Sequence, residues 1–218
     1  MARDAEPTRL ALIAAAERLF ATSGINRVSL REISRASGAR NAVALQYHFE
    51  SRDGILRAVL AKHYPDVDRA RHALLNAYEA EQSDDVRLLS EALVMPLAAK
   101  LADADGGPEY LQINAELMNH PIAYEPNPVA GSSRSIDRWR ALVEPHLAQD
   151  ANRLHRRFTA IRFASVELGR RAQSGPHRDD RLFSSHLVDL VSALLVAPVS
   201  SQTTELATDR DRQLSVSR

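Results

Sequence analysis

The segment from Val28 to Phe49 has the most informative spacing of side chains in this chain. Ser29 lies three residues before Glu32, which is the spacing of a capping box: the hydroxyl accepts a backbone N–H and the carboxylate accepts one in return. Gly38 follows a short apolar pattern and suits the left-handed backbone that ends a helix. Two short helices joined by a glycine turn predict a helix-turn-helix, which places its second helix in the major groove of DNA.

The second of these expected helices carries side chains suited to reading bases. Asn and Gln pair with the major-groove edge of adenine, whereas Ala and Val contact the methyl group of thymine. The candidates for base contact are Asn41, Ala42, Val43, Ala44 and Gln46. In the alternative interpretation, Val43 packs against the first helix and Asn41 serves only as a cap. Arg40 and the backbone N–H of Ser29 are candidates to contact phosphates.

This segment and its flanks resemble the DNA-binding domain of the tetracycline-repressor (TetR) family of bacterial transcriptional regulators, over roughly residues 8–64. The resemblance implies that Tyr47, His48 and Arg52 contact phosphates, and the helix cap Ser51 is a further candidate DNA-binding residue; alternatively, Tyr47 is a half-buried core aromatic. From Gly38 to Phe49 the chain is one residue longer than the usual family spacing, so base contacts are not transferred by position. The matching residues are Leu12, Ile13, Ala15, Ala16, Leu19, Phe20, Gly24, Ser29, Glu32, Ile33, Ala36, Gly38, Tyr47, His48, Phe49, Ser51, Arg52 and Leu56.

Charge and composition fit a DNA-binding protein with a limited footprint. The 218 residues carry no net charge, yet the stretch from Arg27 to Arg57 contains six arginines and only three acidic residues. This local excess predicts phosphate binding that weakens as salt rises, and the neutral whole argues against a non-specific coating protein. The chain has no cysteine and no apolar run long enough for a membrane span. We therefore expect a cytoplasmic protein with no membrane partner, no metal and no cofactor.

Helical periodicity predicts an all-α fold of about nine helices in two domains. We expect a helix-turn-helix DNA-binding domain over residues 1–64, a helical regulatory and dimerisation domain over 65–198, and a disordered tail over 199–218. Pro65 should kink or split the long fourth helix. Helices are expected near residues 8–22, 30–37, 41–47, 52–78, 86–103, 109–119, 133–146, 152–173 and 181–196.

Aromatic, methionine and amide side chains of the second domain are candidates for an apolar pocket with a few polar anchors. Each of them alone is as consistent with a core position. The candidates are Met95, Leu101, Tyr110, Asn114, Met118, Tyr124, Trp139 and Phe158. The helices near residues 152–173 and 181–196 combine apolar faces with small residues. In the TetR resemblance they form a homodimer interface, and the alternative is an intramolecular helix pair.

The sequence thus predicts a regulator rather than an enzyme. The expected partners are a double-stranded, palindromic DNA operator, a small-molecule effector and a second copy of the chain; a ligand-released repressor is favoured by the resemblance. The alternative is a helical small-molecule carrier or enzyme whose apolar C-terminal pocket is the functional site. The chain contains no His-Glu-x-x-His, Gly-x-Ser-x-Gly or phosphate-binding glycine motif, and a carrier has no need of the arginine-rich head.

Overall fold

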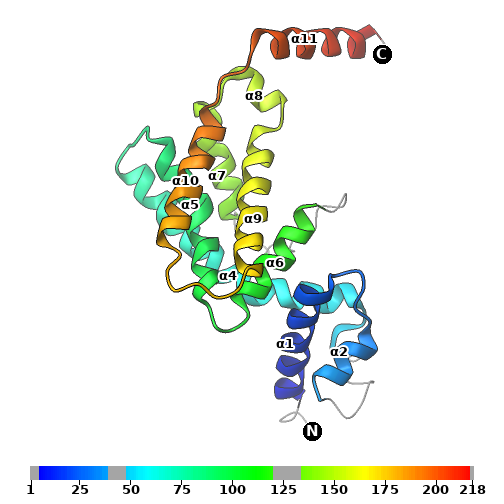
Figure 1. Cartoon of the computed structure of the whole chain (residues 1–218). Helices are drawn as coiled ribbons and strands as arrows, with labels where there is room; N and C mark the ends of the chain where they lie inside the picture. Colours follow the sequence, from blue (N-terminus) through cyan, green and yellow to red (C-terminus); the bar gives the residue numbers. More distant parts are fainter. Residues whose placement is uncertain (1–4, 39–47, 120–133, 217–218) are drawn as a thin grey trace.

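The structure, a computed structural model, describes residues 5–38, 48–119 and 134–216, and is all-α over these residues (Figure 1). The N-terminal domain, here called the head, contains α1 (Ala5–Ser23), α2 (Leu30–Ala36) and the beginning of α4 (Arg52–Ala80). Its core is a compact set of apolar side chains that includes Leu12, Ile13, Phe20, Ile33, Phe49, Ile55 and Val59. The expected helix near residues 41–47 lies outside the described residues.

Helix α4 connects the head to the second domain without a break (Figure 1). Pro65 was expected to kink or split this helix. The helix is not split, because it runs through Pro65 from Arg52 to Ala80. Pro65 leaves the carbonyl of Ala61 without its helical donor, but both residues are exposed, so this carbonyl faces water. The helix continues to Ala80 because its far half packs on the second domain through Val67, Leu75 and Tyr78.

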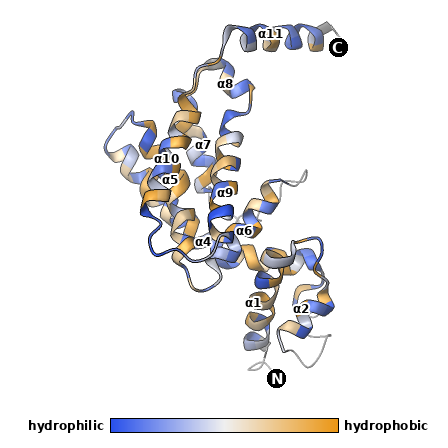
Figure 2. Cartoon of the chain, viewed as in Figure 1, coloured by the Kyte–Doolittle hydropathy of each residue, from blue (hydrophilic) through white to orange (hydrophobic). Residues whose placement is uncertain are grey.

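The second domain is a bundle built around α5 (Val86–Ala98), α6 (Gly107–Met118), α9 (Arg156–Gln173) and α10 (Arg181–Val196), with α7 (Ser135–Val143) beside α4 and α5. Short 3₁₀ turns follow α5 at Ala99–Ala102 and α7 at Glu144–His146. Helices α6 and α9 approach closely at Gly169, where an added Cβ would lie 2.4 Å from the Cβ of Ala115. Figure 2 shows apolar residues concentrated along α5 and α10.

The helix expected near residues 152–173 is interrupted close to its start. Helix α8 (Gln149–Arg153) ends before His155, and α9 begins after it. His155 has a φ of 57°, a left-handed conformation that does not continue a right-handed helix.

The C-terminal tail differs from the expectation of disorder, because residues Ser201–Val216 form helix α11 (Figure 1). The Ser200 hydroxyl accepts the N–H of Thr203 at its start, and Arg212 pairs with Asp209 along it. Thr204 donates to Asp150 of α8 at 2.9 Å, and Arg153 pairs with Asp211. The tail lacks a broad apolar face, but capping, local pairs and these polar tethers hold it in a helix.

Among the described helices, none is by itself long and apolar enough to span a membrane. Only α10 joined with residues 201–215, a pair bent by 58°, passes a test of length and composition. Helix α10 buries Leu187, Val191 and Leu195 within the bundle, as a core helix does.

Candidate functional site

The start of α2 has the capping geometry that the sequence predicts. The Ser29 hydroxyl accepts the N–H of Glu32 at 3.3 Å, and a Glu32 carboxylate oxygen accepts the N–H of Ser29 at 2.8 Å. The Ser29 hydroxyl also donates to the Glu32 carboxylate at 2.7 Å, and this hydrogen bond, followed by the one from the Ser29 N–H, lowers the pKa of the Glu32 carboxyl. Because the Ser29 N–H already donates to Glu32, the suggested phosphate contact through this group competes with the cap.

The start of α4 depends on two small residues, Ser51 and Gly54. The Ser51 hydroxyl accepts the N–H of Gly54 at 3.1 Å, so Ser51 acts as the helix cap. A Cβ on Gly54 would lie 1.9 Å from the carbonyl oxygen of Phe49, so only glycine fits there. Arg52 donates to the carbonyl of Asn26 at 3.1 Å, which ties α4 to the turn between α1 and α2. The half-buried Arg52 therefore has a positioning contact in addition to its expected phosphate contact.

His48 is half-buried beside Phe49, whose ring also lies 5.8 Å from the Arg9 guanidinium. The head thus brings four of the expected DNA contacts into the described structure: Ser29, His48, Ser51 and Arg52. The other seven lie outside the described residues: Arg40, Asn41, Ala42, Val43, Ala44, Gln46 and Tyr47.

The head is joined to the second domain by a buried polar junction that sequence reasoning missed. Glu17 of α1 is 2% exposed and accepts hydrogen bonds from Lys62 at 2.9 Å and from His63 at 2.6 Å. Burial opposes the charge of Lys62, but its hydrogen bonds to Asp105 and Glu17 raise the pKa of Lys62 above the ordinary value. One signal in the sequence could have revealed this junction: Glu17 is an acidic residue on the otherwise apolar face of α1.

A second junction lies near the C-terminal end of α6. The carboxylate of Glu116 accepts the backbone N–H of Ile25, with its two oxygens at 3.0 and 3.1 Å. Gly24, at φ 87°, turns the chain at the end of α1, directly before Ile25. At the other end of α6, a Cβ on Gly106 would lie 2.0 Å from a Glu17 carboxylate oxygen. Helix α6 therefore holds the head at both of its ends.

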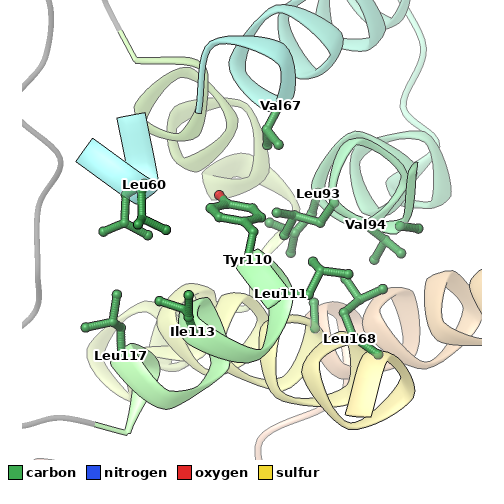
Figure 3. Close-up of a cluster of buried hydrophobic side chains, with 14 of the residues drawn as sticks. Leu60, Val67, Leu93, Val94, Tyr110, Leu111, Ile113, Leu117 and Leu168 are labelled. Atoms are coloured by element: carbon green, nitrogen blue, oxygen red, sulfur yellow. The ribbon is translucent and has the colours of Figure 1, made fainter. Parts of the chain in front are cut away.

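The second domain encloses a mostly apolar cavity of about 180 Å³, here called the central cavity. It lies between α4, α5, α6, α9 and the segment around α7. Figure 3 shows Tyr110 of α6 projecting between Leu60 and Val67 of α4 and Leu93 of α5. The lining residues are Leu60, Tyr64, Val67, Arg71, Leu93, Leu97, Tyr110, Asn114, Leu117, Met118, Arg134, Ile136, Arg140, Phe158, Ile161 and Ser165.

Four of the eight residues expected at a pocket line this cavity: Tyr110, Asn114, Met118 and Phe158. Three others do not. Met95 lies on the outer face of α5, 42% exposed, and Leu101 is in the 3₁₀ turn after α5. Trp139 is fully buried in the core, where its indole N–H donates to the carbonyl of Leu89 at 2.7 Å. Tyr124 lies outside the described residues.

The polar wall of the central cavity centres on Arg71, which is 4% exposed. Its Nε donates to the carbonyl of Ala92 at 3.1 Å and its Nη1 to the Ser135 hydroxyl at 3.2 Å. The Ala92 carbonyl is one that Pro96, four residues on, leaves without its helical donor. Burial lowers the pKa of Arg71. Sequence reasoning missed the arginine that fills the opening left by Pro96.

Two phenols share this wall. Burial raises the pKa of Tyr110 to about 12, and the same effect, helped by the charge of Asp68, raises the pKa of Tyr64 to about 12. Both hydroxyls are therefore protonated and available as donors near neutral pH. The Tyr64 hydroxyl donates to Asp68 at 3.2 Å. The other face of Tyr110 stacks on His63, with ring centroids 4.8 Å apart, so the cavity and the Glu17 junction share a wall.

A small helical head with the capped helix α2, followed by a helical domain with a cavity, fits the class of helix-turn-helix DNA-binding proteins with a separate helical domain. Residues 12–59 match the family described as bacterial regulatory proteins, tetR family. The match covers the head alone, so the chain carries a TetR-type helix-turn-helix domain, which is the DNA-binding domain of transcriptional regulators. Among curated proteins, none matches the chain.

Proposed function

We propose that the chain acts as a cytoplasmic homodimer on a palindromic operator and is released when a small molecule occupies the central cavity. Repression by the free protein, relieved by ligand, is the favoured direction. The role is regulatory rather than catalytic. We assign residues 1–64 to DNA binding and 65–198 to ligand binding and dimerisation, with the boundary inside α4.

The observation that carries this proposal is that α6 both lines the central cavity and contacts the head. Its residues Tyr110, Asn114, Leu117 and Met118 line the central cavity, while Glu116 and the preceding Gly106 contact the head. A ligand that displaces α6 must therefore strain or break the contacts to Ile25 and Glu17. The effect is a coupling free energy: ligand favours an arrangement of α6 and the head that DNA disfavours.

Dimerisation is supported by apolar residues left exposed on α10. Leu182, Leu190 and Val196 are 84, 41 and 55% exposed. Helices α9 and α10 pack side by side, so a second copy with the same pair would form a four-helix seam. Such a dimer presents two heads to two half-sites of one operator.

The proposal is tested by selecting bound sequences from a pool of random duplex DNA. The expected product is an inverted repeat, protected over both half-sites in footprinting. Gel shifts with that site then screen small molecules for release. Enrichment of a single, unrepeated half-site would contradict the dimer, and release by compounds whose binding does not depend on cavity residues would contradict the site.

A further inference from the structure

The central cavity contains a buried positive charge that no acid in its lining balances. Its lining includes Arg71, Arg134 and Arg140 but no aspartate or glutamate. Arg134 and Arg140 both pair with Asp137, at 2.7 and 2.8 Å, whereas Arg71 has no such ion pair within the described residues.

The carboxylate that interacts electrostatically with Arg71 is Asp68, one turn earlier on α4. It acts through Ser135, which accepts from Arg71 and donates its backbone N–H to Asp68 at 2.8 Å. Asp68 also accepts from Tyr64 and lies 3.7 Å from His72, so its charge is shared among several groups. A buried guanidinium with only neutral hydrogen-bond acceptors is costly unless an anion compensates it.

Donors remain unused on the cavity side of this wall. Arg71 makes two hydrogen bonds, which leaves further N–H groups of the guanidinium without an acceptor in the described part of the chain. The Tyr110 hydroxyl, on a side chain 6% exposed, makes no hydrogen bond there either, although it interacts electrostatically with Arg71. Around these donors the lining is apolar, with Leu93 and Leu97 of α5 and Ile161 of α9.

We propose that the central cavity binds a small amphipathic carboxylate, with its anionic head against Arg71 and Tyr110 and its compact apolar body among the leucines and Phe158. This inference rests on the proposed function, because it names the chemical class of the effector. A carboxylate accepts several N–H and O–H donors at once, and the planar guanidinium matches its geometry. A neutral ligand would leave Arg71 uncompensated, and a cation would be repelled.

The test compares three ligands with the same chain and different heads: octanoate, octanol and octylamine. Binding to the full chain is measured by calorimetry and by thermal melting. Octanoate is expected to bind on the order of tenfold or more tightly than octanol, because a charged partner strengthens the hydrogen bonds. Octylamine should not bind. Failure of every carboxylate in a series from hexanoate to dodecanoate would overturn the proposal.

Variants test whether the preference for octanoate over octanol depends on Arg71 and Tyr110. Arg71→Met should remove the preference for octanoate over octanol, whereas Arg69→Met, an exposed arginine two residues away on the same helix, should retain it. Arg71→Lys keeps the charge and should keep a reduced preference. If Arg71→Met does not fold, Tyr110→Phe deletes one oxygen and should weaken octanoate alone, by about three- to tenfold. An unchanged octanoate preference in folded Arg71→Met or Tyr110→Phe would overturn the assignment.

DNA release is measured separately, so the two proposals fail in different ways. Octanoate binding that depends on Arg71 but leaves the DNA complex intact would support the ligand class and refute release by ligand. Equal binding of octanoate and octanol, with both releasing DNA, would refute the ligand class and support release from this cavity.

Discussion

At the residue scale, Arg52 combines an observed structural contact with a proposed contact to DNA. Its guanidinium positions the start of α4 through Asn26 while remaining partly exposed on the head. Arg52→Ala should weaken binding to all DNA sequences and flatten the plot of log affinity against log salt by about one unit, as expected for one lost phosphate contact. Arg40→Ala should do the same. Gel-shift titrations at several salt concentrations measure the slopes.

The control for this prediction is Arg69→Ala, because Arg69 is an exposed arginine in the half of α4 that lies in the second domain. Its slope should equal that of the wild type. Thermal melting of Arg52→Ala separates loss of the Asn26 contact from loss of a phosphate contact. Unaltered slopes in both head variants would exclude these arginines from the phosphate contacts.

Trp139 is expected to matter for stability rather than for ligand binding. Replacing it by Phe removes the indole N–H that donates to Leu89 and leaves space in a fully buried position. Trp139→Phe should lower the free energy of unfolding by about 2–4 kcal/mol, measured by urea denaturation. Octanoate affinity should be unchanged in the folded variant. A large loss of affinity at unchanged stability would place Trp139 at the ligand instead.

The contrast between Trp139 and Arg71 shows what the sequence allows at this scale. A large aromatic in an amphipathic helix fits a core or a pocket equally well, and only tertiary packing decides between them. Arg71 looked like an ordinary charged surface residue, because its acceptors come from α5 and α7, far along the chain. Local cues were sufficient for the Ser29–Glu32 capping box, since both partners lie within one helical turn.

At the element scale, α6 is the expected transmitter between the cavity and the head. Glu116→Gln keeps the size of the side chain but replaces two charged acceptors for the Ile25 N–H by one neutral acceptor. The ligand-induced drop in DNA affinity should shrink by about 0.5–2 kcal/mol, the range seen when a coupling residue is changed. DNA affinity measured with and without ligand gives this coupling directly.

Glu109→Gln is the matched control, since Glu109 lies in the first turn of the same helix and has no hydrogen bond or ion pair in the described structure. It should leave the coupling unchanged. Equal coupling in Glu116→Gln and the wild type would show that the head senses the ligand by another route, such as the stack of Tyr110 on His63.

Elements were more predictable than their contacts. Helical periodicity, caps and prolines located most of the described helices closely, because these signals lie within single turns of the chain; the located helices are α1, α2, α4, α5, α6, α7, α9 and α10. The break at His155 was not predicted, since histidine has no strong preference for a left-handed backbone. Helix α11 was missed because its stability comes from tethers to α8 rather than from an apolar face.

At the scale of the whole molecule, the seam between two copies decides whether the protein can hold both half-sites of an operator. Leu190 lies on α10 and is 41% exposed, whereas Leu194 packs partly into the core, so Leu190 is the cleaner probe of the surface. In a dimer through α9 and α10, Leu190→Glu would bury an unpaired carboxylate, at a cost of several kcal/mol. The expected product is a folded monomer with much weaker operator binding.

Light scattering measures the mass of this variant, and circular dichroism establishes that it is folded. The control is Leu10→Glu, which places the same charge on an apolar residue of the head that is 54% exposed and distant from the seam in sequence. It should keep the dimer mass. If folded Leu190→Glu has the wild-type mass at micromolar concentration, the copies associate through another surface. The spacing of the two heads must then be derived from that surface, because half-site separation follows from the symmetry axis of the dimer.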